Sequence, residues 1–171
     1  MRMLIPLGAV VLLTAEDCTT KAPTSDSSPP SLEWVITNKT AGPAHDSATH
    51  INGSGTVNVK RGEEYQVTLN ARDPEGVRKI QLGGAGGYGC SNGNVGQSVT
   101  IDQKTDVQEL SPNAQNEVLK QIFLLRSAFF ASGWDCQSGW TFSGGNLQFF
   151  GTGENYFNGQ AKGTLTFAVS P

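Results

Sequence analysis

Apolar and polar side chains alternate along most of the chain from Leu32 onward. The clearest case is segment 65–72, where Tyr, Val, Leu and Ala occupy every second position between polar residues. A period of two predicts a β-strand with one buried and one solvated face. Shorter segments with strand character lie at 34–36, 57–59, 77–82, 97–103, 147–150 and 164–169. Short strands separated by turns predict an all-β sandwich or barrel.

Turn-forming residues lie between these predicted strands. Residues 73–76 read Asp-Pro-Glu-Gly, the favoured chemistry of a type I turn, and Asn158-Gly159 predicts a hairpin between the last two strands. Segment 83–96 holds seven of the 21 glycines and predicts a flexible loop. This segment contains a G-x-G-x-x-G match at 84–89, but the Cys-Ser-Asn-Gly-Asn that follows does not start a helix. We therefore expect no nucleotide cofactor.

Segment 118–130 fits two periodicities. Its apolar residues fall at i, i+4, i+7 and i+11 from Val118, which is a helical stripe. The apolar run 122–125 instead suits a strand that is buried on both faces. We predict a strand here, with a short helical turn near 111–117, because a strand gives the better account of the cysteines.

The chain has three cysteines. Neither Cys90 nor Cys136 lies in a C-x-x-C motif or at metal-ligand spacing from another Cys or His, so we expect no metal site. If 120–130 is a strand, the two loops that carry these residues lie at the same end of the sandwich, where Cα atoms can approach within about 7 Å. We predict a disulfide that closes a loop of about 47 residues and stabilises the fold by roughly 4 kcal/mol. Such a bond persists in oxidising compartments.

The N-terminal residues carry the pattern of an export signal. Arg2 precedes an apolar run over 4–14, which is too short for the span of about 20 residues that a bilayer requires. Cys18 follows closely, and 19–31 are rich in Ser, Thr and Pro. This arrangement resembles a bacterial lipoprotein signal. The resemblance implies a signal peptide at 1–17, a lipid anchor at Cys18 and a flexible tether at 18–31. Ordinary secretion after cleavage at Ala15 is the alternative.

Two segments of the remaining chain, 32–171, carry a second resemblance. Residues 70–77 read Asn-Ala-Arg-Asp-Pro-Glu-Gly-Val, and residues 153–159 read Gly-Glu-Asn-Tyr-Phe-Asn-Gly. The first resembles the B-strand, turn and C-strand entry of bacterial immunoglobulin-like extracellular domains, and the second resembles their last hairpin. The resemblance implies an immunoglobulin-like antiparallel β-sandwich of about seven to eight strands over 32–171, with a role in binding or spacing and no catalytic residues.

Composition and charge exclude several classes of function. There are 12 basic and 15 acidic residues, so the chain has no positive field for nucleic acid. Only 16% of residues are charged, and Ser, Thr, Asn and Gln make up 50 of the 171, which is unlike a helical bundle. His45 and His50 are the only histidines, and neither helix nor strand puts residues five apart on one face. We therefore expect these histidines to be solvated loop residues, without a catalytic or metal-binding role.

The strongest candidate site is aromatic. Trp134 and Trp140 bracket Cys136, and Tyr88 lies two residues before Cys90, so the disulfide would gather three rings at one end of the domain. Exposed aromatic clusters suit sugar stacking or protein contact, whereas buried ones would simply close the open end of the sandwich. The sequence predicts an exported, non-enzymatic module that binds a protein or an envelope glycan and meets the membrane only through its lipid anchor. The alternatives are a carbohydrate-binding domain that uses Trp134 and Trp140, and a small secreted hydrolase.

Overall fold

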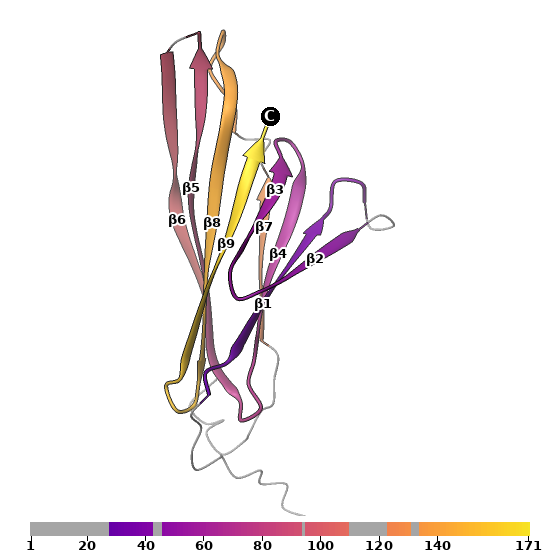
Figure 1. Cartoon of the computed structure of the whole chain (residues 1–171), viewed down its shortest axis with the longest axis vertical. Helices are drawn as coiled ribbons and strands as arrows, with labels where there is room; N and C mark the ends of the chain where they lie inside the picture. Colours follow the sequence, from indigo (N-terminus) through magenta and orange to yellow (C-terminus); the bar gives the residue numbers. More distant parts are fainter. Residues whose placement is uncertain (1–27, 43–45, 94, 110–122, 131–133) are drawn as a thin grey trace, which may run out of the picture.

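Nine strands make up the described part of the chain. The computed structural model describes residues 28–42, 46–93, 95–109, 123–130 and 134–171, with 101–106, 108–109 and 123–130 described by their backbone alone. The strands form two sheets, ordered β2-β1-β4-β7 and β3-β9-β8-β5-β6, and only β3 and β9 pair in parallel. The two sheets form a β-sandwich (Figure 1), so the all-β prediction is confirmed, with nine strands in place of seven or eight. The strands are β1 (Ser31–Asn38), β2 (Ser47–Asn52), β3 (Gly55–Lys60), β4 (Glu64–Arg72), β5 (Val77–Asn92), β6 (Val95–Glu109), β7 (Phe123–Phe130), β8 (Thr141–Asn155) and β9 (Gln160–Ser170).

The hydrophobic core lies between the inner faces of the two sheets. Trp34 is fully buried, and its Nε1 donates to the carbonyl oxygen of Gly53 at 2.8 Å, so the indole N–H keeps a partner away from water. Phe167 meets Tyr65 and Phe149 edge to face, with ring centroids 5.6 and 5.3 Å apart. The other large apolar side chains that are fully buried are Leu69, Ile80, Leu165, Val59, Val67 and Val77.

Strand β5 is much longer than the sequence predicts. The loop expected at 83–96 is wrong, because β5 continues to Asn92 and β6 begins at Val95. β5 pairs with β8 on one side and with β6 on the other over almost its whole length, and these backbone pairs need no side chains. At the top of Figure 1, β5, β6 and β8 extend beyond the ends of the other strands.

One glycine on the inner face of β5 has a packing role. A Cβ at Gly86 would lie 2.5 Å from the carbonyl oxygen of Asn146 and 3.0 Å from the side chain of Leu147, whereas a Cβ at Gly84 would make only ordinary contacts, the nearest at 3.6 Å. The absence of a side chain at Gly86 lets β8 and its Leu147 pack close to β5. Glycine lowers strand propensity, but this close packing between neighbouring strands compensates for it.

The end opposite the β5–β6 hairpin holds the two predicted turns. At 73–76 the Gly76 N–H donates to the carbonyl oxygen of Asp73 at 3.2 Å, so the predicted turn is confirmed. The β8–β9 hairpin is also confirmed, and its Asn158 has a φ of 64°, a conformation that Asn tolerates. Asn155 Oδ1 accepts hydrogen bonds from the backbone N–H groups of Phe157 and Gly159. Both turns lie at the bottom of Figure 1.

The ordered domain begins before Leu32. The fully buried Asn155 donates from Nδ2 to the carbonyl oxygen of Ser28 at 2.9 Å, and Pro30 is buried. These contacts hold the chain just before β1. The earlier part of the predicted tether, 18–27, and the predicted signal peptide, 1–17, lie outside the described residues.

The ambiguous segment 118–130 contains a strand. β7 covers 123–130 and pairs antiparallel with β4, with Leu69 opposite Leu125. The helical turn expected near 111–117 lies outside the described residues, as does His45. His50 lies on β2, so the prediction of a loop position for this histidine is wrong.

Candidate functional site

The predicted disulfide is present. Cys90 and Cys136 are bonded, with their Cα atoms 5.8 Å apart, which is within the usual range for a disulfide. Cys90 is buried near the end of β5 and Cys136 lies between β7 and β8, so the bond ties the long hairpin strand to a connection from the opposite sheet. Cys90 lies on β5 and not in a loop, so that part of the prediction is wrong. It does lie at the predicted end of the domain.

Aromatic rings pack beside the disulfide. Tyr88 stacks on Trp134 with ring centroids 5.2 Å apart and lies 5.9 Å from the ring of Phe142. Trp134 is only 6% exposed, and the Tyr88 hydroxyl donates to the carbonyl oxygen of Asp135 at 3.1 Å. The Arg61 guanidinium lies 5.2 Å from the centre of the Phe142 ring, a cation–π geometry. The rings therefore close this end of the sandwich.

The glycine at 145 is what lets Trp134 close that end. A Cβ at Gly145 would lie 2.5 Å from the Trp134 ring and 2.9 Å from Cβ of Tyr88, so only glycine fits there. Trp140 lies just before β8, is half-buried, and donates its backbone N–H to the carbonyl oxygen of Gln137 at 3.0 Å. Of the three predicted site residues, Tyr88 and Trp134 are thus brought together in the packing and do not form an exposed platform.

The outer face of β5 carries the most unusual surface. Ile80 and Leu82 are buried on the inner face, and since side chains alternate along a strand, the odd-numbered positions point outward. From 83 to 89 these outward positions are Gly83, Ala85, Gly87 and Gly89, so β5 places no side chain larger than a methyl group on this face. We call this strip the trench. The six steps from residue 83 to residue 89 make it about 20 Å long.

Polar side chains from the neighbouring strands form the walls of the trench. Thr100 on β6 and Asn146 on β8 both pair with Gly87, and Ser98 on β6 pairs with Gly89. At twice the spacing between strands, the two walls stand about 10 Å apart. The upper part of the trench is a depression of about 590 Å³, and every residue that lines it is uncharged.

Two of the trench glycines have close neighbours. A Cβ at Gly87 would lie 2.5 Å from the carbonyl oxygen of Val99, so the backbone of β6 excludes a side chain there. A Cβ at Gly89 would meet the Ser143 hydroxyl at 2.8 Å, and that group can rotate away. Backbone crowding therefore explains why residue 87 is glycine. It does not explain why the other outward positions of the strip are also small.

An exposed aromatic ring stands at the lower end of the trench. Phe150 on β8 is 41% exposed and pairs with Gly83 on one side and with Thr164 of β9 on the other. Gly83 places no side chain of its own next to the ring. The trench thus runs from a hydroxyl- and amide-lined depression to a single exposed aromatic residue.

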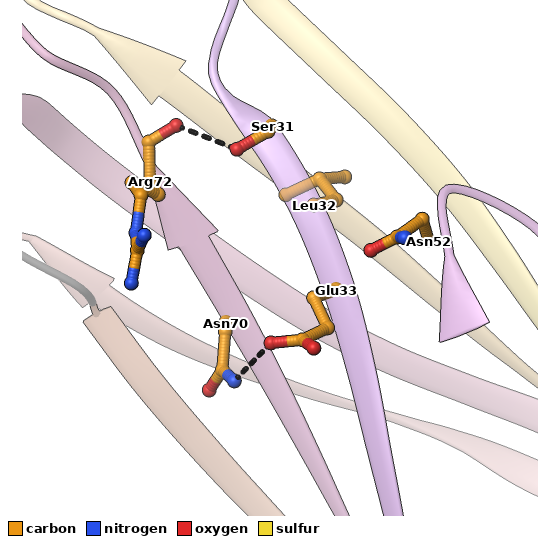
Figure 2. A pocket seen from close by; sticks show the side chains of 6 residues that line it. All are labelled: Ser31, Leu32, Glu33, Asn52, Asn70 and Arg72. Carbon is orange, nitrogen blue, oxygen red and sulfur yellow. Dashed lines mark hydrogen bonds between the residues drawn. The ribbon is translucent and has the colours of Figure 1, made fainter. Parts of the chain in front are cut away.

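A second, smaller pocket lies on the outer face of the other sheet. Its volume is about 280 Å³, and Figure 2 shows its residues on β1, β4 and the end of β2. Glu33 accepts a hydrogen bond from Asn70 Nδ2 at 3.0 Å, and Ser31 donates its hydroxyl to the carbonyl oxygen of Arg72 at 3.1 Å. These polar groups therefore bind one another.

His50 completes this network from β2. Its Nδ1 lies 2.9 Å from a carboxylate oxygen of Glu33. The hydrogen bonds from His50 and then from Asn70 lower the pKa of Glu33. A hydrolytic triad would need a serine hydroxyl aimed at the histidine. The pocket's serine, Ser31, is committed to a backbone carbonyl, so this pocket is better described as a hydrogen-bonded surface network than as a catalytic centre.

Sequence reasoning missed the trench and its walls. The local pattern carries no signal for it, because the inward positions Gly84 and Gly86 are as small as the outward positions of 83–89. The glycine content of this segment favours a loop. Ser98, Thr100, Ser143, Asn146 and Phe150 carry no motif of their own and gain their significance only from the strand register.

No protein-family model matches the chain, and no curated protein sequence matches it. Within the described ranges no three His, Cys, Asp or Glu side chains gather in a group that could hold a metal ion. The same part of the chain contains no helix with the length and hydropathy needed to cross a bilayer.

Proposed function

We propose that this protein is an exported, non-enzymatic binding module whose ligand-facing surface is the outer face of the five-stranded sheet. The observation that carries the proposal is the trench. Natural sheets fill their exposed faces with side chains, whereas here the interior strand β5 leaves a strip about 20 Å long without large side chains of its own. Glycine in a strand interior weakens the sheet and often marks a place where a ligand or another backbone approaches closely.

The strand order supports an immunoglobulin-like assignment. Immunoglobulin domains place strands A, B and E side by side in one sheet and strands C, F and G in the other. If β1, β4 and β7 correspond to A, B and E, the observed order β1-β4-β7 matches that arrangement. The neighbours β5, β8 and β9 then match C, F and G, and β6 takes the place of C′ in variable-type domains. Domains of this class commonly act as binding or spacing units outside the cell.

The disulfide supports export. A bonded cysteine pair is expected in an oxidising compartment, and pairing Cys90 with Cys136 leaves Cys18 as the odd residue. We place a lipid anchor at Cys18, which lies outside the described residues, followed by a tether that ends close to Ser28. A lipid-attached tether would hold the sandwich at a membrane surface with its sheet faces free.

The anchor is tested by lipid labelling. Cells that express the full chain are grown with a radiolabelled or alkyne-bearing fatty acid, and Cys18→Ser is the comparison. Incorporation into the native chain and its loss in Cys18→Ser are expected. A mature protein that starts at Glu16 without an acyl group would contradict the anchor and leave secretion as the alternative.

The binding face is tested by blocking it. Ser98→Arg introduces a long cation over Gly89 at an exposed position, and Thr37→Arg makes the same type of change on β1, in the other sheet. We expect the purified protein to bind isolated cell envelopes, Ser98→Arg to abolish the binding, and Thr37→Arg to retain it. Equal binding by both variants would place the ligand on another surface and contradict the proposal.

A further inference from the structure

We propose that the trench binds a neutral glycan chain laid along β5, with one sugar ring resting on Phe150. This inference rests on the proposed function and assigns a ligand class to its binding face. Phe150 takes the place of Trp134 as the expected aromatic contact, because the Trp134 ring is buried beside the disulfide.

The chemistry of the walls selects an uncharged, hydroxyl-rich ligand. Ser98, Thr100 and Ser143 offer hydroxyl groups and Asn146 offers an amide, so each wall residue can both donate and accept a hydrogen bond. Sugar hydroxyls also donate and accept, and they match this set. A charged ligand would find no opposite charge among the residues that line the depression.

The shape of the trench suits a linear chain. Its floor is backbone with one methyl group, and its walls stand about 10 Å apart where Thr100 on β6 and Asn146 on β8 flank Gly87. A single side chain inserted by a protein partner would leave most of this floor uncovered. A chain of linked sugar rings would instead cover Gly89, Gly87, Ala85 and Gly83 in turn.

Phe150 provides the apolar contact that such a ligand needs. Phe150 is 41% exposed on the outer face of β8, next to Gly83 in the strand register. Sugar rings present C–H faces that pack on aromatic rings, and binding sites generally combine one apolar surface with a few placed polar groups. The trench contains both parts within one continuous strip.

The test uses neutral oligosaccharides of defined structure. The full chain is titrated with N-acetylchitohexaose, cellohexaose and maltohexaose by calorimetry, and a heparin hexasaccharide serves as the charged comparison. We expect measurable binding to at least one neutral probe and none to heparin. Asn146→Ala should weaken that binding about tenfold, the worth of about one hydrogen bond.

A matched control is available on the same sheet. Asn58 on β3 and Asn146 on β8 both pair with Ala168 of β9, but only Asn146 borders the trench. Asn58→Ala should leave affinity unchanged. Phe150→Ala should also lose about tenfold, and Phe150→Trp should keep the affinity because it restores the aromatic face. All these positions are exposed, so unchanged thermal unfolding verifies that each variant is folded.

The outcomes separate this inference from the proposed function. If no neutral probe binds, or if Asn146→Ala and Asn58→Ala weaken binding equally, the glycan inference is overturned. If envelope binding is still blocked by Ser98→Arg in that case, the proposed function stands with a protein as the partner. Heparin binding as tight as that of the neutral probes would also overturn the inference. If the native chain binds neither cell envelopes nor any oligosaccharide, the glycan inference and the proposed function are both overturned.

Discussion

Removal of the Cys90–Cys136 bond gives a quantitative test of how this fold is held together. The two residues are 46 positions apart in the chain, and cross-linking them removes loop-closure entropy from the unfolded state. With that loop length the chain-entropy model gives about 4 kcal/mol of stabilisation at 25 °C. Since Tyr88 and Trp134 pack beside the bond, the loss of packing adds to this figure and does not reduce it.

The measurement is urea unfolding of a Cys90→Ser, Cys136→Ser double variant, followed by tryptophan fluorescence and circular dichroism. The free energy of unfolding should fall by about 4 kcal/mol relative to the native chain. A reductant should lower the free energy of unfolding of the native chain by a similar amount. Cys18→Ser in both proteins removes mixed disulfides from the comparison. A loss below about 1 kcal/mol would refute the reasoning, because it would mean that the unfolded chain gains little freedom when the bond is absent.

Three further predictions concern titration and close packing. Burial and a hydrogen bond to a nearby carboxylate raise the pKa of Tyr65 to about 12. The contribution of the neutral Tyr65 to the free energy of unfolding is therefore complete below about pH 10 and is lost as pH rises toward 12. Tyr65→Phe should therefore flatten the alkaline fall in unfolding free energy. The hydrogen bond from His50 lowers the pKa of Glu33, so that stabilisation is present above about pH 4.3 and lost as pH falls further. Glu33→Gln should flatten this acid limb and change stability at neutral pH by less than about 1 kcal/mol, measured by urea unfolding across pH. Gly151→Ala would place a Cβ 2.8 Å from two core side chains and should destabilise by about 1–3 kcal/mol in thermal or urea unfolding, whereas Gly96→Ala, with its nearest neighbour at 4.0 Å, should be neutral.

Local patterns in the sequence carried much of the fold. Strand β4, the turn at 73–76 and the hairpin at Asn158 each follow from residues within ten positions of one another, and each is confirmed. The disulfide also followed, because the parity of strands fixes which end of a sandwich a segment reaches. These features depend on alternation and turn chemistry, which one sequence displays directly.

The length of β5 could not be predicted in the same way. Glycine disfavours strands, so segment 83–92 has the propensity of a loop. It is a strand because β6 and β8 pair with its backbone on both sides and because Leu147 packs against the space that Gly86 leaves. Such tertiary contacts override local preference. The pairs with β8 join residues about 60 positions apart, which no local window contains.

The candidate site depends on the same long-range register. Thr100, Gly87 and Asn146 lie in one row across three strands, and nothing in their sequence neighbourhoods relates them. The aromatic cluster shows the same dependence on packing: the sequence indicates the end of the domain where Tyr88 and Trp134 lie, and the structure favours the alternative in which the rings close that end. Gly145 leaves room for the Trp134 ring on the inner side, where a Cβ would lie 2.5 Å from that ring.

The disulfide and the trench form one energetic arrangement. Glycine in a strand interior costs about 0.5–1 kcal/mol relative to alanine, so the five glycines at 83, 84, 86, 87 and 89 together weaken β5 by roughly 2.5–5 kcal/mol. The bond at Cys90 lies at the end of the same strand and contributes about 4 kcal/mol, a quantity of the same size. The cross-link and the pairing of β5 with both of its neighbours therefore act together to offset the glycine content of this strand. Since the two contributions are of similar size, the stabilisation that the bond provides is large enough to allow an outer strip without large side chains on β5.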